Sequence, residues 1–393
     1  MEKTRHFPAV VIGAGPAGAA AAFTLASSGV PTCLIDRRKF PRDKLCGGLL
    51  TLRAKKTFDR VFAGNWGGLV EATAGGIQFY ARSGRIDPPE IYSTLFFTQR
   101  YHFDNALLTM ARSAGCTVRL GSGVRQIDLA RKSVQLPDGE VIRYDYLIGA
   151  DGVNSVVAKT LFGAAFDRKT IGFALEMDVP ANLLPDASTL PEIHFGVARW
   201  GYGWVFPKQG IYTVGMGGLY ALNPDLRARF ERFLIKRLGT LPAQKIKGHF
   251  VPFGDFRRQP GRDNVLLCGD AAGLVDSITG EGIAFAMQSG NAAGAAIAAA
   301  LAAGVAPLEQ YMHEYSAITT HIRKSNFYRR LIFPRLSEKL FLAAIPDAST
   351  IQRSYLDLLA ADIEYDALPG RIWIQLQNGG RKITGRIMGR PVQ

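Results

Sequence analysis

The chain has 393 residues and a formal net charge of +14, and 47% of its residues are hydrophobic. This composition provides a large core and excludes an intrinsically disordered or fibrous protein. The positive charge suits nucleic acids, anionic membranes and anionic cofactors. Because basic and aromatic residues do not alternate in a nucleic-acid-binding pattern, we expect no nucleic-acid partner.

The cysteines and the apolar runs narrow the class of protein further. Cys33, Cys46, Cys116 and Cys268 are widely spaced, which argues against a zinc site and a disulfide scaffold, so we expect no metal. The first apolar run ends in a glycine motif, which indicates a strand rather than a signal peptide. The longest run of small apolar residues, 292–304, is too short to span a bilayer. We therefore expect a cytoplasmic protein, with peripheral membrane contact left open.

Residues 9–37, AVVIGAGPAGAAAAFTLASSGVPTCLIDR, predict a strand, a glycine turn, a helix and a second strand. Gly13 permits the tight turn, Gly15 lets the backbone approach a pyrophosphate, and Gly18 lets the helix lie close to the strand. The helix N-terminus favours phosphate groups, and Asp36 is placed to accept ribose hydroxyls. This is a dinucleotide-binding unit, and it does not by itself separate FAD from NAD. The same unit adds three predicted cofactor contacts: Pro16, Ala17 and Arg37.

Two later segments decide between FAD and NAD as the expected cofactor. Residues 144–159 predict a strand followed by Asp151 and Gly152, and residues 264–290 predict a strand that ends at Gly269 and Asp270. With the first motif, they resemble the FAD-dependent family of the aromatic-hydroxylase fold. The resemblance implies that the second motif contacts pyrophosphate groups and that the third binds a ribityl hydroxyl of FAD through its aspartate.

The second motif departs from that family's pattern. The family usually has an arginine where Ala158 and Lys159 fall, which weakens the expectation of an NADPH site there. NADPH or another reductant is still expected as the electron donor, and its identity stays open.

Further positions elsewhere in the chain are predicted to contact the cofactor. The loop Thr279-Gly280-Glu281-Gly282 suits a close approach to a flat ring, and the helix beginning near Ile283 could stabilise negative charge on reduced flavin. Arg100 begins a helical pattern, and the resemblance places an arginine here near the FAD phosphates; a surface arginine at a helix start is the alternative. Val124 completes the predicted cofactor set.

The scattered motifs predict an α/β fold with a discontinuous Rossmann-type FAD-binding domain. That domain is assigned to residues 1–70, 100–160 and 258–320. The inserts at 71–99 and 161–257 contain strand-like runs, among them 192–208, and are expected to form an antiparallel-sheet substrate domain. Residues 224–238 predict a helix on that sheet, and residues 321–393 predict a helical C-terminal region.

Two short motifs narrow the family. Leu45-Cys46-Gly47-Gly48 follows the dinucleotide unit, and residues 200–208 read WGYGWVFPK. Together they resemble the geranylgeranyl reductase family of polyprenyl reductases, which has a Cys-Gly-Gly loop and a Tyr-x-Trp-x-Phe-Pro motif. Leu45 stands where the family usually has proline. The resemblance implies a substrate site that includes Tyr202, Trp204, Phe206 and Pro207, and a catalytic set that includes Cys46, Tyr202 and Trp204.

The residues themselves leave alternatives open. On a strand, Tyr202, Trp204 and Phe206 point to one side, where they form either an aromatic wall for an isoprenoid or an ordinary buried sheet face. In the loop with Gly47 and Gly48, Cys46 either donates a proton beside the flavin or is a small residue in a tight turn.

We therefore expect an FAD-dependent reductase of polyprenyl C=C bonds acting on a hydrophobic small molecule or lipid. One alternative is a monooxygenase that hydroxylates an aromatic compound or a protein side chain, since the fold does not decide. Another is an electron carrier to a membrane quinone, which would need no closed substrate chamber.

The C-terminal region is basic. Residues 321–393 contain twelve Lys and Arg against six Asp and Glu. This excess predicts either a solvated basic face or a contact with anionic lipid around residues 326–340, at roughly 1 kcal/mol for each charge.

Overall fold

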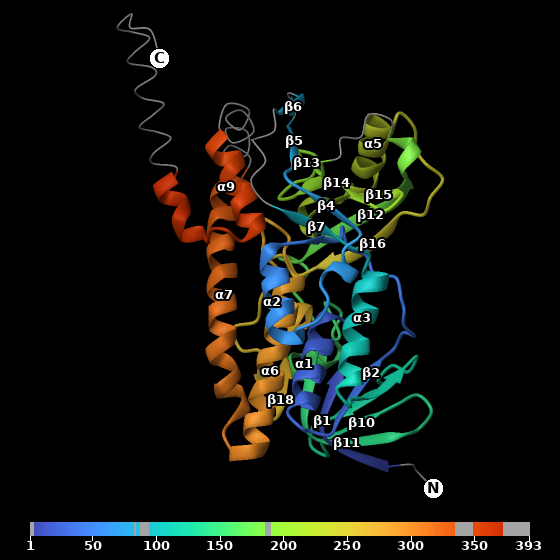
Figure 1. The fold of residues 1–393 in the computed structure, drawn as a ribbon, viewed down its shortest axis with the longest axis vertical. Coiled ribbons are helices and arrows are strands. Elements are labelled where there is room, and N and C mark those ends of the chain that lie inside the picture. The colour runs from blue at the N-terminus through green and yellow to red at the C-terminus, as the bar shows by residue number, and fades with distance from the viewer. Residues whose placement is uncertain (1–3, 82–83, 87–93, 185–189, 335–348, 372–393) are drawn as a thin grey trace, which may run out of the picture.

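The computed structural model describes residues 4–81, 84–86, 94–184, 190–334 and 349–371. It is a mixed α/β structure with two large sheets, which lie toward opposite ends of the long axis of the molecule (Figure 1). The three predicted nucleotide motifs belong to one sheet, and the aromatic motif belongs to the other. The fold class expected from the sequence is confirmed.

The first sheet has the order β17-β18-β11-β1-β2-β8, with the β9–β10 hairpin added to β11. Its strands are β1 (Thr4–Ile12), β2 (Thr32–Asp36), β8 (Thr117–Leu120), β9 (Gln126–Asp128), β10 (Ser133–Gln135), β11 (Val141–Gly149), β17 (Gly261–Arg262) and β18 (Val265–Leu267). Strands β18, β11, β1, β2 and β8 run parallel. Their carboxyl ends therefore share one edge, and the loops that follow β1, β2 and β11 meet there.

Helices cover the faces of this sheet and supply most of its core. They are α1 (Pro16–Ser27), α3 (Arg100–Ser113), α4 (Val156–Phe162), α6 (Ile283–Ala303) and α7 (Pro307–Ile332). The core includes Cys33, Cys116 and Cys268, which are at most 5% exposed. Helix α7 runs without a break through residue 320, where the sequence analysis divides the cofactor domain from the C-terminal region.

Helices α1 and α6 lie in unusually close contact. A β-carbon on Gly290 would fall on the backbone of Ala17, and one on Gly294 would lie 2.8 Å from the carbonyl oxygen of Ala21. Thr24 and Asn291 join the same two helices through a side-chain hydrogen bond of 2.8 Å. The run of small residues in α6 is therefore a helix-packing surface.

The second sheet has the order β16-β12-β15-β14-β13-β5-β6. Its strands are β5 (Gln78–Ala81), β6 (Gly84–Ile86), β12 (Gly172–Pro180), β13 (Glu192–Phe195), β14 (Tyr202–Lys208), β15 (Ile211–Leu219) and β16 (Lys247–Val251). All neighbours are antiparallel except β13 and β5. The run 192–208 holds two strands rather than one, because positive φ angles at Gly196 and Trp200 turn the chain between them.

The two faces of the second sheet have different partners. Helix α5 (Leu226–Leu238) packs on one face, where Phe230 and Leu234 are fully buried. The other face meets helix α9 (Ser349–Ala360) and the loop before α6. This second face contains Tyr202 and Phe206.

The remaining described elements are short. They are α2 (Leu52–Phe62), β3 (Leu49–Leu50), β4 (Ala72–Ala74), β7 (Leu95–Phe97), the single turns η1 (Gly67–Leu69), η2 (Ala181–Leu183), η3 (Tyr220–Leu222) and η4 (Gly269–Ala271), and the C-terminal turn η6 (Tyr365–Ala367). Strands β3, β7 and β4 form a small sheet directly after the Cys46 loop. None of the described helices is both long and apolar enough to cross a membrane.

Candidate flavin and substrate site

A cavity of about 640 Å³ lies between the carboxyl edge of the first sheet and the inner face of the second. Most of the residues predicted to bind the cofactor line it. They are Gly13, Gly15, Pro16, Ala17, Asp36, Arg37, Cys46, Gly47, Gly48, Arg100, Val124, Asp151, Gly152, Asp270, Gly280, Gly282 and Ile283. Tyr202, Trp204 and Phe206 also line it. The cavity therefore has a nucleotide end, formed by the loops of the first sheet, and a substrate end, formed by the second.

The glycine turn at the nucleotide end has the geometry expected from the sequence. Gly13 has φ +100°, and a β-carbon there would fall on the Ala150 carbonyl oxygen. Asp36 is 8% exposed, and its carboxylate accepts the Ala14 N–H at 2.7 Å. The first turn of α1 has no capping side chain. Its N–H groups therefore point into the cavity, where an anion can satisfy them.

Two arginines lie over this turn, held by one acid. Asp104 is fully buried; Arg100 contacts it at 2.6 and 2.8 Å, and Arg42 contacts it at 2.8 Å. A β-carbon on Gly15 would lie 3.7 Å from Arg42 Nη2 and 4.0 Å from Arg100 Nη2. Arg42 Nη1 is buried without a partner. Burial lowers the pKa of Arg42, although Asp104 partly opposes this.

These features fit a dinucleotide. A pyrophosphate at the glycine turn would satisfy the unpartnered Arg42 Nη1 and the free N–H groups of α1. No pattern in the sequence selects Arg42 or Asp104 as a site residue. Their role follows only from the fold, because Arg42 lies in the loop after β2 while Asp104 is in the second turn of α3.

The second and third motifs reach the same cavity in different ways. Asp151 caps α4, accepting the Val156 N–H at 2.6 Å, so its carboxylate is already engaged. Asp270 faces the cavity and interacts electrostatically with Lys44 and Arg100. Lys44 Nζ lies 2.8 Å from His249 Nε2, and burial lowers the pKa of Lys44 to about 8.

The Cys46 loop separates the two ends of the cavity. Gly48 has φ +82°, and a β-carbon there would fall on the Thr98 carbonyl oxygen. The Gly48 N–H donates to Cys46 Sγ at 3.4 Å, and Lys208 Nζ lies 3.5 Å from the Cys46 carbonyl oxygen. A β-carbon on Gly47 would lie 2.9 Å from the Phe206 ring. Both glycines are therefore required by close contacts of the loop.

Three aromatic side chains of β14 form a wall beside this loop. The ring centroids of Tyr202 and Trp204 are 6.1 Å apart, and those of Trp204 and Phe206 are 6.3 Å apart. Tyr202 donates to the Thr279 carbonyl oxygen at 2.7 Å, and its hydroxyl lies 2.8 Å from the place of a β-carbon on Gly280. The wall is therefore bonded to the loop that precedes α6.

Three predicted residues do not line the cavity. A β-carbon on Gly18 would fall on the Gly13 carbonyl oxygen, so this glycine serves helix–strand packing. Gly269 packs against Ala17 and donates its N–H to Ser289 at 2.9 Å. Pro207 follows Phe206 on β14, where side chains alternate, and so points away from the wall.

The C-terminal region contributes to the substrate end, which the sequence did not predict. Tyr355 and Leu359 of α9 line the cavity. The Tyr355 ring packs edge-on against Phe79 at 5.7 Å and Phe195 at 5.8 Å. Helix α9 therefore covers the inner face of the second sheet.

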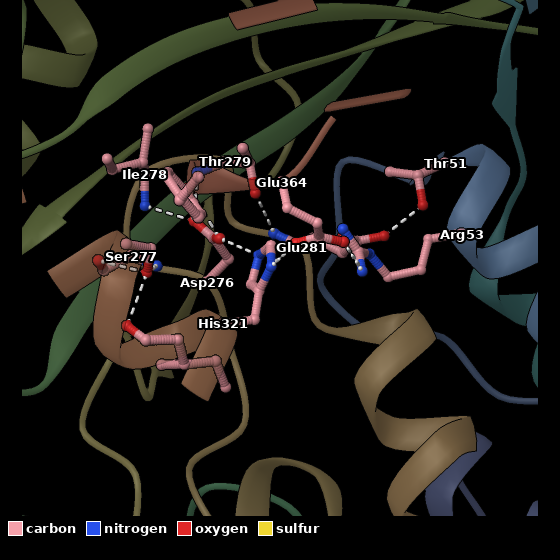
Figure 2. A network of polar contacts seen from close by, with 12 residues as sticks. Thr51, Arg53, Asp276, Ser277, Ile278, Thr279, Glu281, His321 and Glu364 are labelled. Atoms are coloured by element: carbon pink, nitrogen blue, oxygen red, sulfur yellow. Dashed lines mark hydrogen bonds and ion pairs between the residues drawn. The ribbon is translucent and has the colours of Figure 1, made fainter. Parts of the chain in front are cut away.

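Ion pairs, buried at Asp276 and His321 and half-exposed at Glu364, hold this C-terminal region on the loop before α6 (Figure 2). His321 of α7 lies 2.8 Å from Asp276 and 2.5 Å from Glu364. Tyr365 donates to the Asp276 carboxylate at 2.8 Å. Burial opposes the charged form of His321, but the two carboxylates outweigh it and raise its pKa to about 9.

Arg53 extends this network to the Cys46 side of the cavity. It contacts Glu281 and Glu364, each at 3.0 Å. Thr51, which follows the Cys46 loop, donates to Glu281. The network therefore connects three segments that border the cavity: the start of α2, the loop before α6, and the C-terminal turn.

The chain is similar in sequence to a family of FAD-binding domains and to known reductases. A family model described as an FAD binding domain matches residues 6–194. Geranylgeranyl diphosphate reductase from the chloroplast of Oryza sativa is 31% identical over 339 residues, covering 78% of this chain and 69% of that protein. Menaquinone reductase from Mycolicibacterium smegmatis is 30% identical over 325 residues, covering 72% and 74%.

The chain belongs to the geranylgeranyl reductase family of FAD-dependent oxidoreductases. FAD is its cofactor, as the sequence predicted. The family resemblance inferred from the Cys-Gly-Gly loop and the aromatic motif is confirmed.

Solved structures share the fold of this geranylgeranyl reductase family member. A geranylgeranyl bacteriochlorophyll reductase-like protein from Thermoplasma acidophilum has a TM-score of 0.76 at 22% identity, covering 88% of this chain and 92% of that one. PqsL from Pseudomonas aeruginosa, a probable FAD-dependent monooxygenase, has a TM-score of 0.67 at 16% identity, covering 87% and 100%. One fold therefore carries both kinds of chemistry.

Proposed function

We propose that the protein reduces C=C bonds of a polyprenyl group, such as a geranylgeranyl chain, with FAD as the hydride carrier. The observation that carries this proposal is that the aromatic wall of β14 and the Cys46 loop line the same end of the cavity, side by side and in contact at Gly47. An apolar chain fits in the cavity along this joint surface, because wall and loop expose rings and glycine backbone there. The similar proteins named above point the same way, since geranylgeranyl diphosphate and menaquinone both carry polyprenyl chains.

Hydrogenation of an alkene needs a hydride and a proton. FAD supplies the hydride when it is bound and reduced. Cys46 would supply the proton, because its thiol lies in the loop that borders both ends of the cavity. Lys44 and Arg100 interact electrostatically with Cys46 and would stabilise the thiolate left behind.

The other residues of the substrate end would hold the chain and exclude water. Tyr202 is tied to Thr279, so its ring is fixed beside the loop before α6. Trp204 and Phe206 press against Gly47 and hold the Cys46 loop in place. In this proposal Tyr202 and Trp204 position the substrate, and Cys46 handles the proton.

The test uses FAD-loaded protein reduced with dithionite under nitrogen. Geranylgeraniol, geranylgeranyl diphosphate and a fully saturated analogue are supplied in parallel. We expect a mass gain of one hydrogen pair for each reduced bond, together with reoxidation of the flavin absorbance. The saturated analogue should cause neither. If no polyprenyl compound gains mass or reoxidises the flavin, the proposal is wrong.

A monooxygenase is the second candidate, favoured by the fold shared with PqsL. Rapid mixing of the reduced protein with oxygen separates the two. A long-lived hydroperoxide absorbance that decays with hydroxylation of an added aromatic would favour oxygenation.

An electron carrier to a quinone would need no closed chamber, and the cavity with its aromatic wall counts against that alternative.

NADPH and other reductants remain candidates for the electron donor. Anaerobic mixing of the oxidised protein with NADPH, NADH or a reduced ferredoxin, each alone, would identify the donor by loss of the flavin absorbance. A compound that leaves the flavin absorbance unchanged at millimolar concentration is not the electron donor.

Helix α7 supports a peripheral contact with anionic membrane. Phe327 and Leu331 are 59% and 53% exposed, and Arg323 and Arg330 are exposed beside them on the same helix. Arg329 does not belong to this surface, because it is buried and donates to the Phe253 carbonyl oxygen. Residues 335–348 and 372–393, which hold other predicted basic residues, lie outside the described residues.

Liposome co-sedimentation tests this contact. We expect binding to rise with anionic lipid content and to weaken by about 30-fold or more in Phe327→Ser/Leu331→Ser, since each exposed ring or alkyl group contributes about 1–2 kcal/mol on insertion. Leu301→Ser, on exposed α6, is the matched control. Sedimentation that does not depend on anionic lipid would refute the contact.

A further inference from the structure

A buried carboxyl group lies behind the Cys46 loop. Glu176 of β12 is 3% exposed, and its Oε1 accepts the Cys46 N–H at 2.9 Å. Its Oε2 is also buried and has no hydrogen-bond partner among the described residues. Cys46 lines the cavity and Glu176 does not. The carboxyl group is therefore next to Cys46 but screened from the cavity by the loop.

A second unpartnered group lies on the same face of the sheet. Gly215 of β15 pairs with Glu176 on one side and with Trp204 on the other. Directly paired residues of antiparallel strands share a face, and a β-carbon on Gly215 would lie 2.7 Å from Trp204 Nε1. The indole thus lies over Gly215, in the direction of Glu176. Its Nε1 is buried and has no hydrogen-bond partner in the part of the chain that the structure describes.

An unpartnered donor and an unpartnered acceptor therefore flank the Cys46 loop. Each such buried group costs about 1–3 kcal/mol unless something satisfies it. Native proteins retain few of them, and those retained mark a bound water or a functional group. A water or a transferred proton bound to Trp204 Nε1 or to Glu176 Oε2 would satisfy these groups.

The charges around Glu176 allow it to gain and lose a proton. Burial has the largest influence and raises its pKa to about 7; Lys208 and the Cys46 N–H oppose this, Asp178 adds to it and Lys247 opposes it. The surroundings of the neighbouring thiol are basic, with Lys44 and Arg100 interacting with Cys46. Near neutral pH the carboxyl group can therefore hold a proton beside a thiol.

We propose that Glu176 is a positioning residue that holds the Cys46 loop and returns a proton to the Cys46 thiol after each transfer to substrate. This deepens the proposed function and rests on it. The S–H bond of Cys46 breaks as a C–H bond forms on the substrate. The O–H bond of Glu176 then breaks, directly or through one water, and the S–H bond forms again. Lys208 and the Cys46 N–H stabilise the carboxylate until solvent protonates it.

Alkylation of Cys46 tests the connection without any polyprenyl substrate. FAD-loaded, oxidised protein is treated with iodoacetamide between pH 5.5 and 9.5, and the Cys46 peptide is quantified by mass spectrometry. The other three cysteines are buried and serve as internal references. In the natural protein, ionised Glu176 opposes thiolate formation, so we expect the rate to rise with pH in two stages.

Glu176→Gln keeps an oxygen acceptor for the Cys46 N–H but does not ionise. We expect a single rise that begins at lower pH, and alkylation about tenfold faster at pH 8. Glu176→Asp keeps an ionisable group and should retain two stages. Asp178→Asn is the matched control, because Asp178 lies two residues along the same strand and bonds Thr213 and Lys247 instead. It should keep both stages and shift the first only slightly to lower pH, because Asp178 makes a smaller contribution than burial to the raised pKa of Glu176.

Multiple-turnover reduction of the substrate, with excess dithionite, gives the second readout, because Glu176 acts after the first proton transfer. The natural protein should slow above about pH 7 as Glu176 loses its proton, while Glu176→Gln should be at least tenfold slower and lack that pH dependence. If Glu176→Gln and the natural protein share one alkylation profile, the inference is overturned whatever the substrate. If the natural protein reduces no polyprenyl compound but the profiles differ, the proposed function fails and the Glu176–Cys46 connection stands.

Discussion

The two ends of the cavity are built in different ways. At the nucleotide end, the glycine turn, Asp36 and the start of α1 lie within 30 residues of one another, and one buried acid, Asp104, orients both arginines. At the substrate end, the wall comes from β14, the proposed acid from the Cys46 loop, and the cover from α9, about 150 residues after the wall. The nucleotide end is therefore locally encoded, whereas the substrate end depends on long-range packing.

If the nucleotide end depends on one acid, Asp104→Asn should lower the free energy of unfolding more than any other substitution in this series. It leaves two buried guanidinium groups without a carboxylate, and breaking such a buried pair costs about 3–5 kcal/mol. We expect the unfolding free energy of the apoprotein to fall by that amount, with a smaller loss when FAD is bound, because phosphate can replace the carboxylate. Urea unfolding with and without FAD measures both.

The control for that comparison is Asp59→Asn. Asp59 pairs with Lys55 on the exposed face of α2, four residues apart, and such pairs contribute less than about 0.5 kcal/mol. Equal losses in the two variants would show that Asp104 has no special role.

His321 tests whether the substrate end depends on distant ion pairs. Folding raises the pKa of His321 to about 9. Its contribution is therefore fully present below its unfolded-state pKa of about 6.5 and is lost as the pH rises through about 9. We expect His321→Gln to lose up to about 3 kcal/mol of unfolding free energy at pH 6 and much less at pH 10.

Thermal unfolding of the natural protein and the variant across this pH range gives the difference directly. His313→Gln, on an exposed part of α7, should show no such pH dependence. A difference that grows with pH would contradict the assigned charge of His321.

Substitutions of Cys46 distinguish a chemical role of its thiol from a packing role in the loop between the two ends of the cavity. Cys46→Ala removes the acid but keeps a small residue in the turn, so we expect FAD binding to be unchanged and hydrogenation to fall about 100-fold. Flavin titration and single-turnover mass analysis measure the two quantities. Cys46→Ser should resemble Cys46→Ala in rate, because a serine hydroxyl is a far weaker acid. Full activity in both variants would leave Cys46 with a packing role only.

Substitution of Tyr202 should have the smallest effect of this series. Tyr202→Phe removes the hydrogen bond to the Thr279 carbonyl oxygen and leaves the ring, so we expect a loss of about 1 kcal/mol in stability. A rise in the KM for the polyprenyl substrate should accompany it, measured by flavin reoxidation. Tyr220→Phe, at an exposed tyrosine, is the control and should be neutral.

The sequence predicted the nucleotide end because its residues act through backbone geometry. Gly13, Gly15 and Asp36 are recognised by their spacing from a strand and a helix, and the structure places them at the cavity as expected. Arg42 was missed, since an arginine in a loop carries no periodic signal. Its place depends on Asp104, which is 62 residues away in sequence.

The substrate end was predicted only in part. The period-two pattern placed Tyr202, Trp204 and Phe206 on one face, but it did not show which element covers that face. Glu176 and Tyr355 depend on strand register and on the docking of α9, which are tertiary effects. No local pattern marks a single buried glutamate on a strand as the partner of a loop 130 residues earlier.

The glycines at 290 and 294 have a consequence for the cofactor. Helix α1 begins at the phosphate turn and α6 begins at the loop beside the predicted ring site, and these glycines fix how closely the two helices lie. The distance between the two helix starts, and so the length of cofactor that both can hold at once, is set by helix packing a full turn or more away from the cavity. A methyl group at position 290 would push the two helices apart and so change the distance between their N-termini.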